Sequence, residues 1–209
     1  MALNFLSAFL MAILCLGGSF NPIHHGHLIC GRAAAEVAGY QRVALIPSNN
    51  PPHKLGDLAP APAQHRAAMC RLAVAGSDLF TVDERELHRP GPSYTIDTAR
   101  ALLDSGSDRV DWLIGSDSLP FLPTWHRAEE LVELVTFKVM FRPGAKVDWH
   151  SLPPKFRALE SQVILTPRID ISATDIRQRL GEGRSIDYLV PPAVADYIHT
   201  HGLYRRGSP

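Results

Sequence analysis

A run of glycine, serine and histidine residues near the N-terminus has the types and spacing that anion chemistry requires. Residues 17–28 read GGSFNPIHHGHL; they follow an apolar run at 12–16 and precede a helical pattern at 28–38. A strand, a glycine turn and a helix N-terminus form an anion site, because backbone N–H groups and the helix dipole point at the turn. His24 and His27 add imidazoles, which donate hydrogen bonds to phosphate oxygens and stabilise developing negative charge.

Three other interpretations of this segment fit its spacing less well. No Gly-Lys-Ser/Thr follows, as a Walker loop requires, and the Gly-x-Gly-x-x-Gly of a dinucleotide fingerprint is absent. His24, His25 and His27 could form a metal site, but structural zinc uses separated Cys and His pairs, and the chain has no Cys-x-x-Cys. A turn with satisfied histidines is the plainest alternative. We expect a phosphate turn without metal ligands.

A second candidate anion site lies towards the C-terminus, where residues 171–177 read ISATDIR. Ser172 stands where an N-cap residue belongs, which leaves first-turn N–H groups available to an anion. Arg177 follows about one helical turn later and can bind the same anion through a fork of donors. An ordinary capped helix with a solvated arginine is the alternative for this motif alone.

These two motifs resemble those of a known family. Residues 17–27 resemble the signature of the His-x-Gly-His nucleotidyltransferases, and within that superfamily the bacterial nicotinate-nucleotide adenylyltransferases. Cytidylyltransferases and class I aminoacyl-tRNA synthetases carry related short motifs. Residues 171–177 resemble the family's Ile-Ser-Ser/Ala-Thr-x-x-Arg motif, which closes over the phosphates of ATP. The resemblance covers about residues 11–204.

The resemblance implies adenylyl transfer from ATP to nicotinate mononucleotide, giving deamido-NAD and pyrophosphate. The acceptor phosphate would attack in line, without a covalent intermediate, so catalysis would come from alignment and charge stabilisation. Mg²⁺ is expected with ATP and should keep mostly water ligands. The implied catalytic residues are His24 and His27. The implied ATP-binding residues are Gly18, Ser19, Phe20, Gly26, Gly115, Asp117, Ser172, Thr174 and Arg177.

Other segments resemble the part of the family that binds the nicotinate nucleotide. Residues 47–54, PSNNPPHK, offer Lys54 as a point charge for a phosphate. Ser93 is expected to cap a helix over 94–103, whose first N–H groups can bind a carboxylate. Trp125 resembles a residue that stacks on the pyridine ring, with core packing as its alternative. The implied substrate-binding residues are Asn50, Lys54, Tyr94, Thr95, Trp125 and His126.

Two nearby residues are expected to be structural. Arg66 should support the fold or the loop before it, and Trp112 should belong to the core. The chain also departs from the family pattern at three positions. It has Asn21 where many members have Asp, Ala173 where many have Ser, and His126 where Tyr is frequent.

The remaining sequence alternates strand and helix patterns. Strands are predicted at 12–16, 42–46, 80–83, 110–114, 137–141 and 163–165, and helices at 28–38, 63–75, 94–103, 128–134, 173–180 and 192–199. Such alternation predicts a single α/β domain with a Rossmann-like, doubly wound parallel sheet and helices on both faces. Ligands of such sheets bind where strands end at a switch point, which suits the first motif.

Composition limits the possible partners and the compartment. With 21 Lys and Arg against 21 Asp and Glu in 209 residues, the formal charge is zero, which argues against a nucleic-acid partner. Cys15, Cys30 and Cys70 are widely spaced, as in buried reduced thiols of a cytoplasmic protein. The apolar residues 2–16 lack a basic flank and are too short for a membrane span.

The boundaries and the rival functions complete these expectations. Met11 is an attractive alternative start, so residues 1–10 are expected to be a dispensable extension, 11–204 the domain and 205–209 a tail. The chain could be a monomer or a homo-oligomer. The rivals are an adenylyltransferase for nicotinamide mononucleotide or phosphopantetheine, and a nucleotide sensor without catalysis.

Overall fold

The fold is built on one parallel sheet. The computed structural model describes residues 12–50, 60–142, 144 and 146–205. Its strands are β1 (Ala12–Gly18), β2 (Val43–Pro47), β3 (Phe80–Val82), β4 (Arg109–Gly115), β5 (Thr136–Phe141) and β6 (Val163–Leu165). They pair in parallel in the order β3-β2-β1-β4-β5-β6. The order reverses between β1 and β4, which makes this pair the switch point where ligands of such sheets bind.

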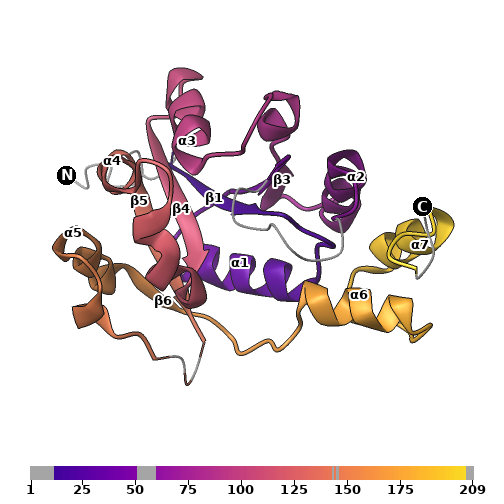
Figure 1. The fold of residues 1–209 in the computed structure, drawn as a ribbon. Coiled ribbons are helices and arrows are strands. Elements are labelled where there is room, and N and C mark those ends of the chain that lie inside the picture. The colour runs from indigo at the N-terminus through magenta and orange to yellow at the C-terminus, as the bar shows by residue number, and fades with distance from the viewer. Residues whose placement is uncertain (1–11, 51–59, 143, 145, 206–209) are drawn as a thin grey trace, which may run out of the picture.

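Helices cover both faces of the sheet, as the alternation predicted. The helices are α1 (His25–Ala38), α2 (Ala63–Ala73), α3 (Thr95–Asp104), α4 (Ala128–Leu134), α5 (Pro154–Arg157), α6 (Ala173–Gly181) and α7 (Pro192–Thr200). Short 3₁₀ helices are η1 (Arg85–His88), η2 (Ser116–Thr124), η3 (Trp149–Ser151) and η4 (Ala158–Gln162). Figure 1 shows α1 on one side of the sheet and α3 and α4 on the other. The predicted doubly wound, Rossmann-like class is confirmed.

Two cores follow from the alternation of side chains along each strand. Leu14 and Leu16 of β1 pack in one core with residues of α1, α2, α6 and α7. Cys15, between them, faces the other core with Ile96 of α3 and Leu131 of α4. Cys15, Cys30 and Cys70 are free and buried, and Trp112 is buried as expected.

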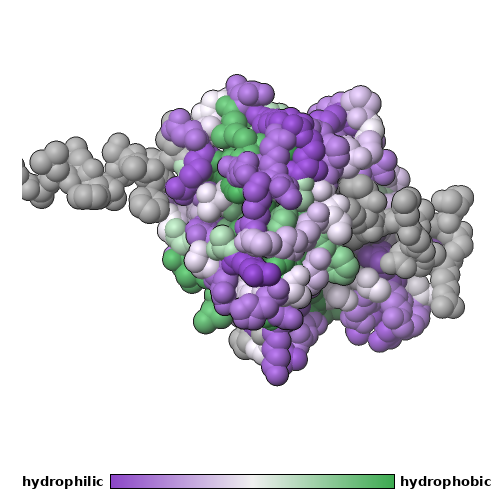
Figure 2. Space-filling view, turned by 60° about the vertical axis from the view of Figure 1, so that its left-hand side comes forward, coloured by the Kyte–Doolittle hydropathy of each residue, from purple (hydrophilic) through white to green (hydrophobic). Residues whose placement is uncertain are grey.

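One face of the molecule is mainly polar. On the face shown in Figure 2 hydrophilic residues predominate, and hydrophobic residues appear in smaller areas between them. None of the helices in the described ranges is long and apolar enough to cross a membrane. The predicted extension at residues 1–10 lies outside the described residues and stays a prediction.

Two helix starts differ from the predictions. Helix α1 begins at His25 and not at residue 28, because His24 has the extended backbone of an N-cap, so Gly26 and His27 lie in the first turn. The prediction that Ser93 caps α3 is wrong: the N-cap is Tyr94, which makes no side-chain cap. The Ser93 hydroxyl instead accepts hydrogen bonds from backbone N–H groups of the loop after β2.

The 3₁₀ helices were not predicted. Helix η2 contains Pro120 and Pro123, which interrupt the periodic pattern by which longer helices are recognised. The segment between β5 and α5 contains η3 and the buried side chain of Leu152.

A buried arginine joins the loops on the ligand side of the sheet. Arg66 of α2 is 1% exposed. Its guanidinium donates to the carbonyl oxygens of Ser19 at 2.6 Å, Asn49 at 3.2 Å and Ala61 at 2.9 Å. These carbonyls belong to the loop after β1, the loop after β2 and the segment before α2. The expectation that Arg66 supports the fold and the adjoining loop is confirmed.

We expect Arg66→Met to lower the unfolding free energy by about 3 kcal/mol or more, because three buried or partly buried carbonyl oxygens lose their charged donor. Urea unfolding measures this. Arg71→Met is the matched control: Arg71 lies on the same helix and forms a surface ion pair with Glu84, worth below about 1 kcal/mol. Equal losses in the two variants would contradict the role given to Arg66.

Candidate nucleotide site

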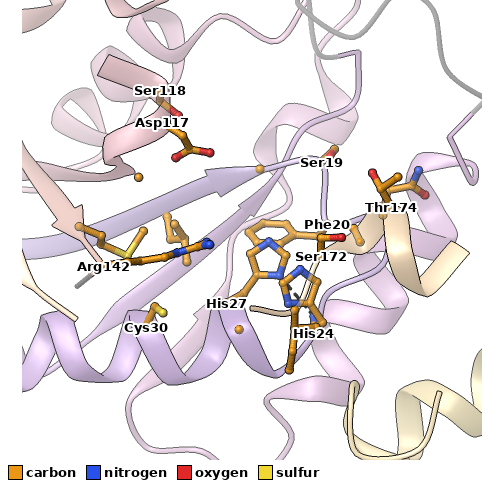
Figure 3. Close-up of a pocket in the computed structure, with 18 of the residues that line it drawn as sticks. Ser19, Phe20, His24, His27, Cys30, Asp117, Ser118, Arg142, Ser172 and Thr174 are labelled. Carbon is orange, nitrogen blue, oxygen red and sulfur yellow. Dashed lines mark hydrogen bonds between the residues drawn. The ribbon is translucent and has the colours of Figure 1, made fainter. Parts of the chain in front are cut away.

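A cavity of about 1040 Å³ lies at the carboxyl ends of the central strands. Its walls come from the loop after β1, the first turn of α1, the ends of β4 and β5, and the start of α6 (Figure 3). All of the predicted catalytic and ATP-binding residues line it, namely Gly18, Ser19, Phe20, His24, Gly26, His27, Gly115, Asp117, Ser172, Thr174 and Arg177. The structure therefore brings together two motifs about 150 residues apart in the chain. Their individual roles stay predictions.

The histidine motif is a close-packed unit at the start of α1. The rings of His24 and His27 are stacked, with centroids 3.8 Å apart and planes 30° apart. A Cβ atom on Gly26 would lie 3.0 Å from the His24 ring, closer than side chains normally allow. Phe20 packs its edge against His27 with centroids 5.1 Å apart. Glycine at 26 is thus required for the His24 ring to lie over the helix start.

Hydrogen bonding fixes how the two imidazoles present their protons. The backbone N–H of His24 donates to Nδ1 of His27 at 3.3 Å, so Nδ1 of His27 is an acceptor and its neutral ring carries the proton on Nε2. Nδ1 of His24 is buried, and within the described part of the chain no group hydrogen-bonds to it. A buried unpaired acceptor costs less than a buried unpaired N–H, so we assign the His24 proton to Nε2 as well.

His24 is held neutral at physiological pH. Burial lowers its pKa from 6.5 to about 4, and the positive charges of Arg142 and His25 act in the same direction. Its side chain is 6% exposed, in agreement with this cause. The site therefore offers His24 as a neutral hydrogen-bond donor, and fixed positive charge comes from arginines.

Arg177 closes the cavity from the start of α6. Its guanidinium donates to the carbonyl oxygen of Asn21 at 2.9 Å and to the Thr174 hydroxyl at 3.3 Å. Ser172 caps α6, as predicted, by accepting from the N–H of Asp175 at 3.0 Å. The guanidinium thus lies beside the loop after β1 and keeps α6 against it. The start of α1 on one side of this loop and Arg177 on the other can therefore bind the same anion.

The departure at position 21 has a structural reason. Oδ1 of Asn21 accepts from the N–H of Ala61 at 3.1 Å and from the Tyr204 hydroxyl at 2.7 Å. The position needs an acceptor oxygen facing two donors, which the Asn amide supplies without adding a buried charge. Through Tyr204, the C-terminal segment thereby holds the loop after β1 in place.

Arg142 is a cavity residue that sequence reasoning missed. It follows β5 and extends into the cavity from the side opposite α6 (Figure 3). No hydrogen bond or ion pair joins it to any residue in the described ranges. The sequence did contain a signal, since 137–141 was predicted as a strand whose carboxyl end meets the same edge of the sheet.

At the end of β4, Asp117 folds back over Gly115. A Cβ atom on Gly115 would lie 2.2 Å from Oδ1 of Asp117, so only glycine permits this position of the carboxylate. Asp117 is an acidic side chain of the cavity wall; Arg142 lies on another wall (Figure 3), and Arg177 lines the cavity from α6. Among the described residues no group of three or more His, Cys, Asp and Glu side chains could hold a metal ion.

The predicted nicotinate-end residues do not line this cavity. Asn50, Tyr94, Thr95, Trp125 and His126 lie around the start of α3 and the end of η2. The rings of Tyr94 and His126 stack with centroids 4.1 Å apart. Trp125 is partly buried and packs edge-on against Phe137 at 6.3 Å, which agrees with its core-packing alternative. Lys54 lies outside the described residues.

The fold and this site define a nucleotidyltransferase of the cytidylyltransferase-like class, and the model of the family described as "Cytidylyltransferase-like" matches residues 15–179. A "Probable nicotinate-nucleotide adenylyltransferase" of Roseiflexus sp. (strain RS-1) is 44% identical over 192 residues, covering 91% of this chain and 96% of that protein. One of Thermus thermophilus, with the same description, is 44% identical over 200 residues, covering 93% and 100%. Within its class, the chain belongs to the family of nicotinate-nucleotide adenylyltransferases.

Solved structures agree on the fold. The Plasmodium falciparum nicotinic acid mononucleotide adenylyltransferase complexed with NaAD superposes with a TM-score of 0.74 over 92% of this chain and 97% of that one, at 21% identity. The same Plasmodium enzyme complexed with APC gives a TM-score of 0.72 at 20% identity. At such identities the likeness concerns the fold alone.

The lowered pKa of His24 predicts a pH-dependent stability. The folded state keeps His24 neutral down to about pH 4, whereas the unfolded chain takes up the proton near pH 6.5. Falling pH therefore favours the unfolded state across this window, and the contribution to stability is complete only above pH 6.5.

Between about pH 7.5 and about pH 4.5 we expect the unfolding free energy of the unmodified protein to fall by about 2–3 kcal/mol more than that of His24→Asn. Urea titrations of both proteins at the two pH values measure the difference. The two proteins have the same carboxylates, so the effect of carboxylate titration on stability cancels in the comparison. Parallel losses would show that His24 titrates normally in the folded state.

Proposed function

We propose that this protein transfers the adenylyl group of ATP to nicotinate mononucleotide, forming deamido-NAD and pyrophosphate in NAD biosynthesis. One observation carries the proposal: a single cavity combines a helix N-terminus, two imidazoles and two arginines with the carboxylate of Asp117, which could accept from ribose hydroxyls. This combination suits a nucleoside polyphosphate, which needs anion binding at one end and hydroxyl recognition at the other. The 44%-identical relatives support the same activity.

The chemistry requires no protein nucleophile. The 5′-phosphate of the mononucleotide is already an anion and attacks the α-phosphorus in line, and the bond to the β-phosphate oxygen breaks as pyrophosphate leaves. Charge then accumulates on the phosphoryl oxygens. His24 and His27 would donate to the α-phosphate region and the leaving group through Nε2, and Ser172 and Arg177 would hold the β- and γ-phosphates. Arg142 supplies positive charge from the opposite wall.

ATP would enter as its Mg²⁺ complex. Mg²⁺ keeps several water ligands and is commonly held by substrate phosphates with few protein ligands. Asp117, the acidic group on the cavity wall, fits either this role or the ribose hydroxyls. We also infer a cytoplasmic enzyme from the three unpaired, buried thiols.

At the other end of the site, the start of α3 would receive the nicotinate. Tyr94 leaves the helix start without a side-chain cap, so backbone N–H groups of the first turn can bind a carboxylate. The stacked pair of Tyr94 and His126 and the ring of Trp125 surround the same helix start. A carboxylate receptor of this kind would favour nicotinate over nicotinamide without a dedicated basic residue.

Pyrophosphate release tests the function, with ATP, Mg²⁺ and one of three acceptors: nicotinate mononucleotide, nicotinamide mononucleotide or phosphopantetheine. Strong preference for the nicotinate acceptor is the expected result. Equal use of both pyridine nucleotides would keep the chemistry and contradict the account of carboxylate recognition. Preference for phosphopantetheine, or no release with any acceptor, would refute the proposed function, the latter in favour of a nucleotide sensor.

His27→Ala should lower kcat about a hundredfold or more, because a preorganised donor to the reacting phosphates is lost. His25→Ala is the matched control, since His25 lies in the same helical turn and does not line the cavity. Its kcat should stay within about threefold of the unmodified enzyme. Similar rates for the two variants would remove His27 from the mechanism.

A further inference from the structure

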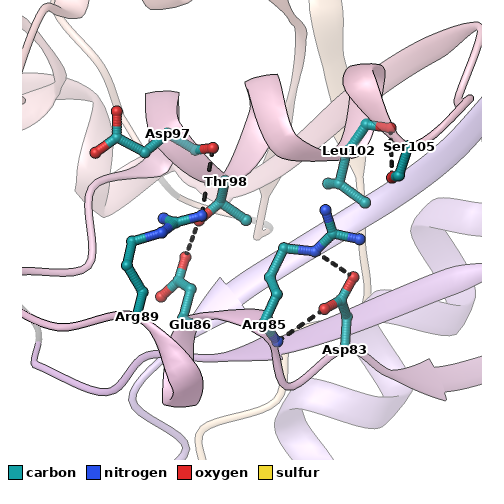
Figure 4. A network of polar contacts seen from close by, with 8 residues as sticks. All are labelled: Asp83, Arg85, Glu86, Arg89, Asp97, Thr98, Leu102 and Ser105. Carbon is teal, nitrogen blue, oxygen red and sulfur yellow. Dashed lines mark hydrogen bonds and ion pairs between the residues drawn. The ribbon is translucent and has the colours of Figure 1, made fainter.

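A buried carboxylate lies behind the nicotinate end of the site. Glu86 of η1 is 4% exposed. Thr98 of α3 donates from Oγ1 to Oε1 of Glu86 at 2.7 Å. The Ser93 hydroxyl, just before α3, lies near Glu86 and acts against the rise in the pKa of Glu86 that burial causes. The Arg89 guanidinium donates to the same Thr98 oxygen at 3.0 Å and to the backbone carbonyl of Asp97 at 3.4 Å (Figure 4). Glu86 therefore connects η1 to the first turns of α3.

Ser93 extends this network to the loop after β2. Its oxygen accepts from the backbone N–H of Asn49 at 3.0 Å and of Asn50 at 3.3 Å. Its own N–H donates to the carbonyl of Asn50 at 3.0 Å. A serine hydroxyl has one proton and two lone pairs. The two amide N–H groups use both lone pairs, so the remaining proton is free to point at the nearby carboxylate of Glu86.

The segments joined in this way are those expected to hold the nicotinate nucleotide. Asn50 belongs to one and Tyr94 and Thr95 to the other. The Asn49 side chain adds a contact of 3.5 Å from Nδ2 to the carbonyl of Arg89. None of these network residues lines the cavity described above. The network can therefore affect one substrate without affecting the other.

We propose that Glu86 is a positioning residue for the nicotinate mononucleotide: through Ser93 and Thr98 it fixes the loop at 48–50 against the start of α3. This inference rests on the proposed function for the identity of the substrate. The claim that Glu86 orders the loop at 48–50 does not depend on the proposed function, because it concerns the structure of the free protein and not the reaction.

The negative charge of Glu86 matters as well as its shape. A carboxylate accepts hydrogen bonds only, so it holds both hydroxyl protons in one direction, and its charge polarises those hydroxyls as acceptors for the groups beyond. In Glu86→Gln, one oxygen becomes an NH₂ group, which competes as a donor. A hydroxyl that rotates away from this NH₂ group no longer points its lone pairs at the groups that donate to it, so one of those hydrogen bonds is lost. Size and burial stay nearly unchanged.

Asp83→Asn is the matched control. Asp83 precedes the same 3₁₀ helix and pairs with Arg85 at 2.8 Å, with a second bond of 3.0 Å from the N–H of Arg85 (Figure 4). This substitution also neutralises a carboxylate beside η1. It leaves Ser93 and Thr98 untouched.

The first experiment measures steady-state kinetics with each substrate varied in turn. Glu86→Gln should raise the KM for nicotinate mononucleotide at least about tenfold, the equivalent of one hydrogen bond, and leave the KM for ATP within about twofold. Ser93→Ala should do the same, and the double variant should be no worse than Ser93→Ala alone, because both act through one hydroxyl. Thr98→Ser, which keeps the hydroxyl, should stay near the unmodified enzyme.

Hydrogen–deuterium exchange of the free protein provides a readout without catalysis. Glu86→Gln should speed exchange of the Asn49 and Asn50 amides, whereas Asp83→Asn should not. Unchanged exchange together with an unchanged KM would overturn the inference, as would an equal rise of KM for both substrates or additive effects in the double variant. If Glu86→Gln fails to fold, Ser93→Ala decides by the same two readouts. An unmodified protein without adenylyl transfer would refute the proposed function alone, because the exchange result stands independently.

Discussion

The ligand side of this molecule depends on the three hydrogen bonds from Arg66. The guanidinium holds the carbonyls of Ser19, Asn49 and Ala61, so the loops after β1 and β2 share one anchor. Burial lowers the pKa of Arg66, yet a guanidinium stays protonated inside proteins, so the charge persists. A planar group with five donors suits three converging carbonyls, which a lysine could not satisfy in the same geometry. The loops proposed to hold phosphate and nicotinate are therefore positioned from one guanidinium.

Charge and hydrogen-bond donors are supplied by different residues within the cavity. Arg142 and Arg177 carry permanent charge on opposite walls, while His24 is kept neutral and close to His27. A protonated His24 would face the positive charges of Arg142 and His25. Binding of a polyphosphate would oppose those repulsions and make protonation of His24 easier, so the imidazoles can follow the charge of the reacting group.

The sequence predicted the features that local patterns encode. Alternating strand and helix runs predicted the sheet, and the two anion motifs predicted residues that the structure unites in one cavity. It did not reveal Arg142 or Glu86, because their importance depends on which strand ends and helices meet in space. Ser93 shows the same limit: its type suggested a local cap, but a pair of N–H groups more than 40 residues away in the chain binds its hydroxyl instead.

The two ends of the site differ in how they are built. The cavity residues proposed to bind phosphate include helix termini, arginines and glycines at which a Cβ atom would press on His24 or Asp117, so changes there would disturb the proposed catalytic groups directly. The proposed nicotinate end would use a loop and a helix start that Glu86 supports through Thr98, and it would offer backbone amides and the stacked rings of Tyr94 and His126. On the proposed function, shifting such a loop by altering its buried supports would change acceptor selectivity and leave the phosphate-binding residues in place. In this family a change of substrate would therefore begin in the buried network and not among the residues that touch phosphate.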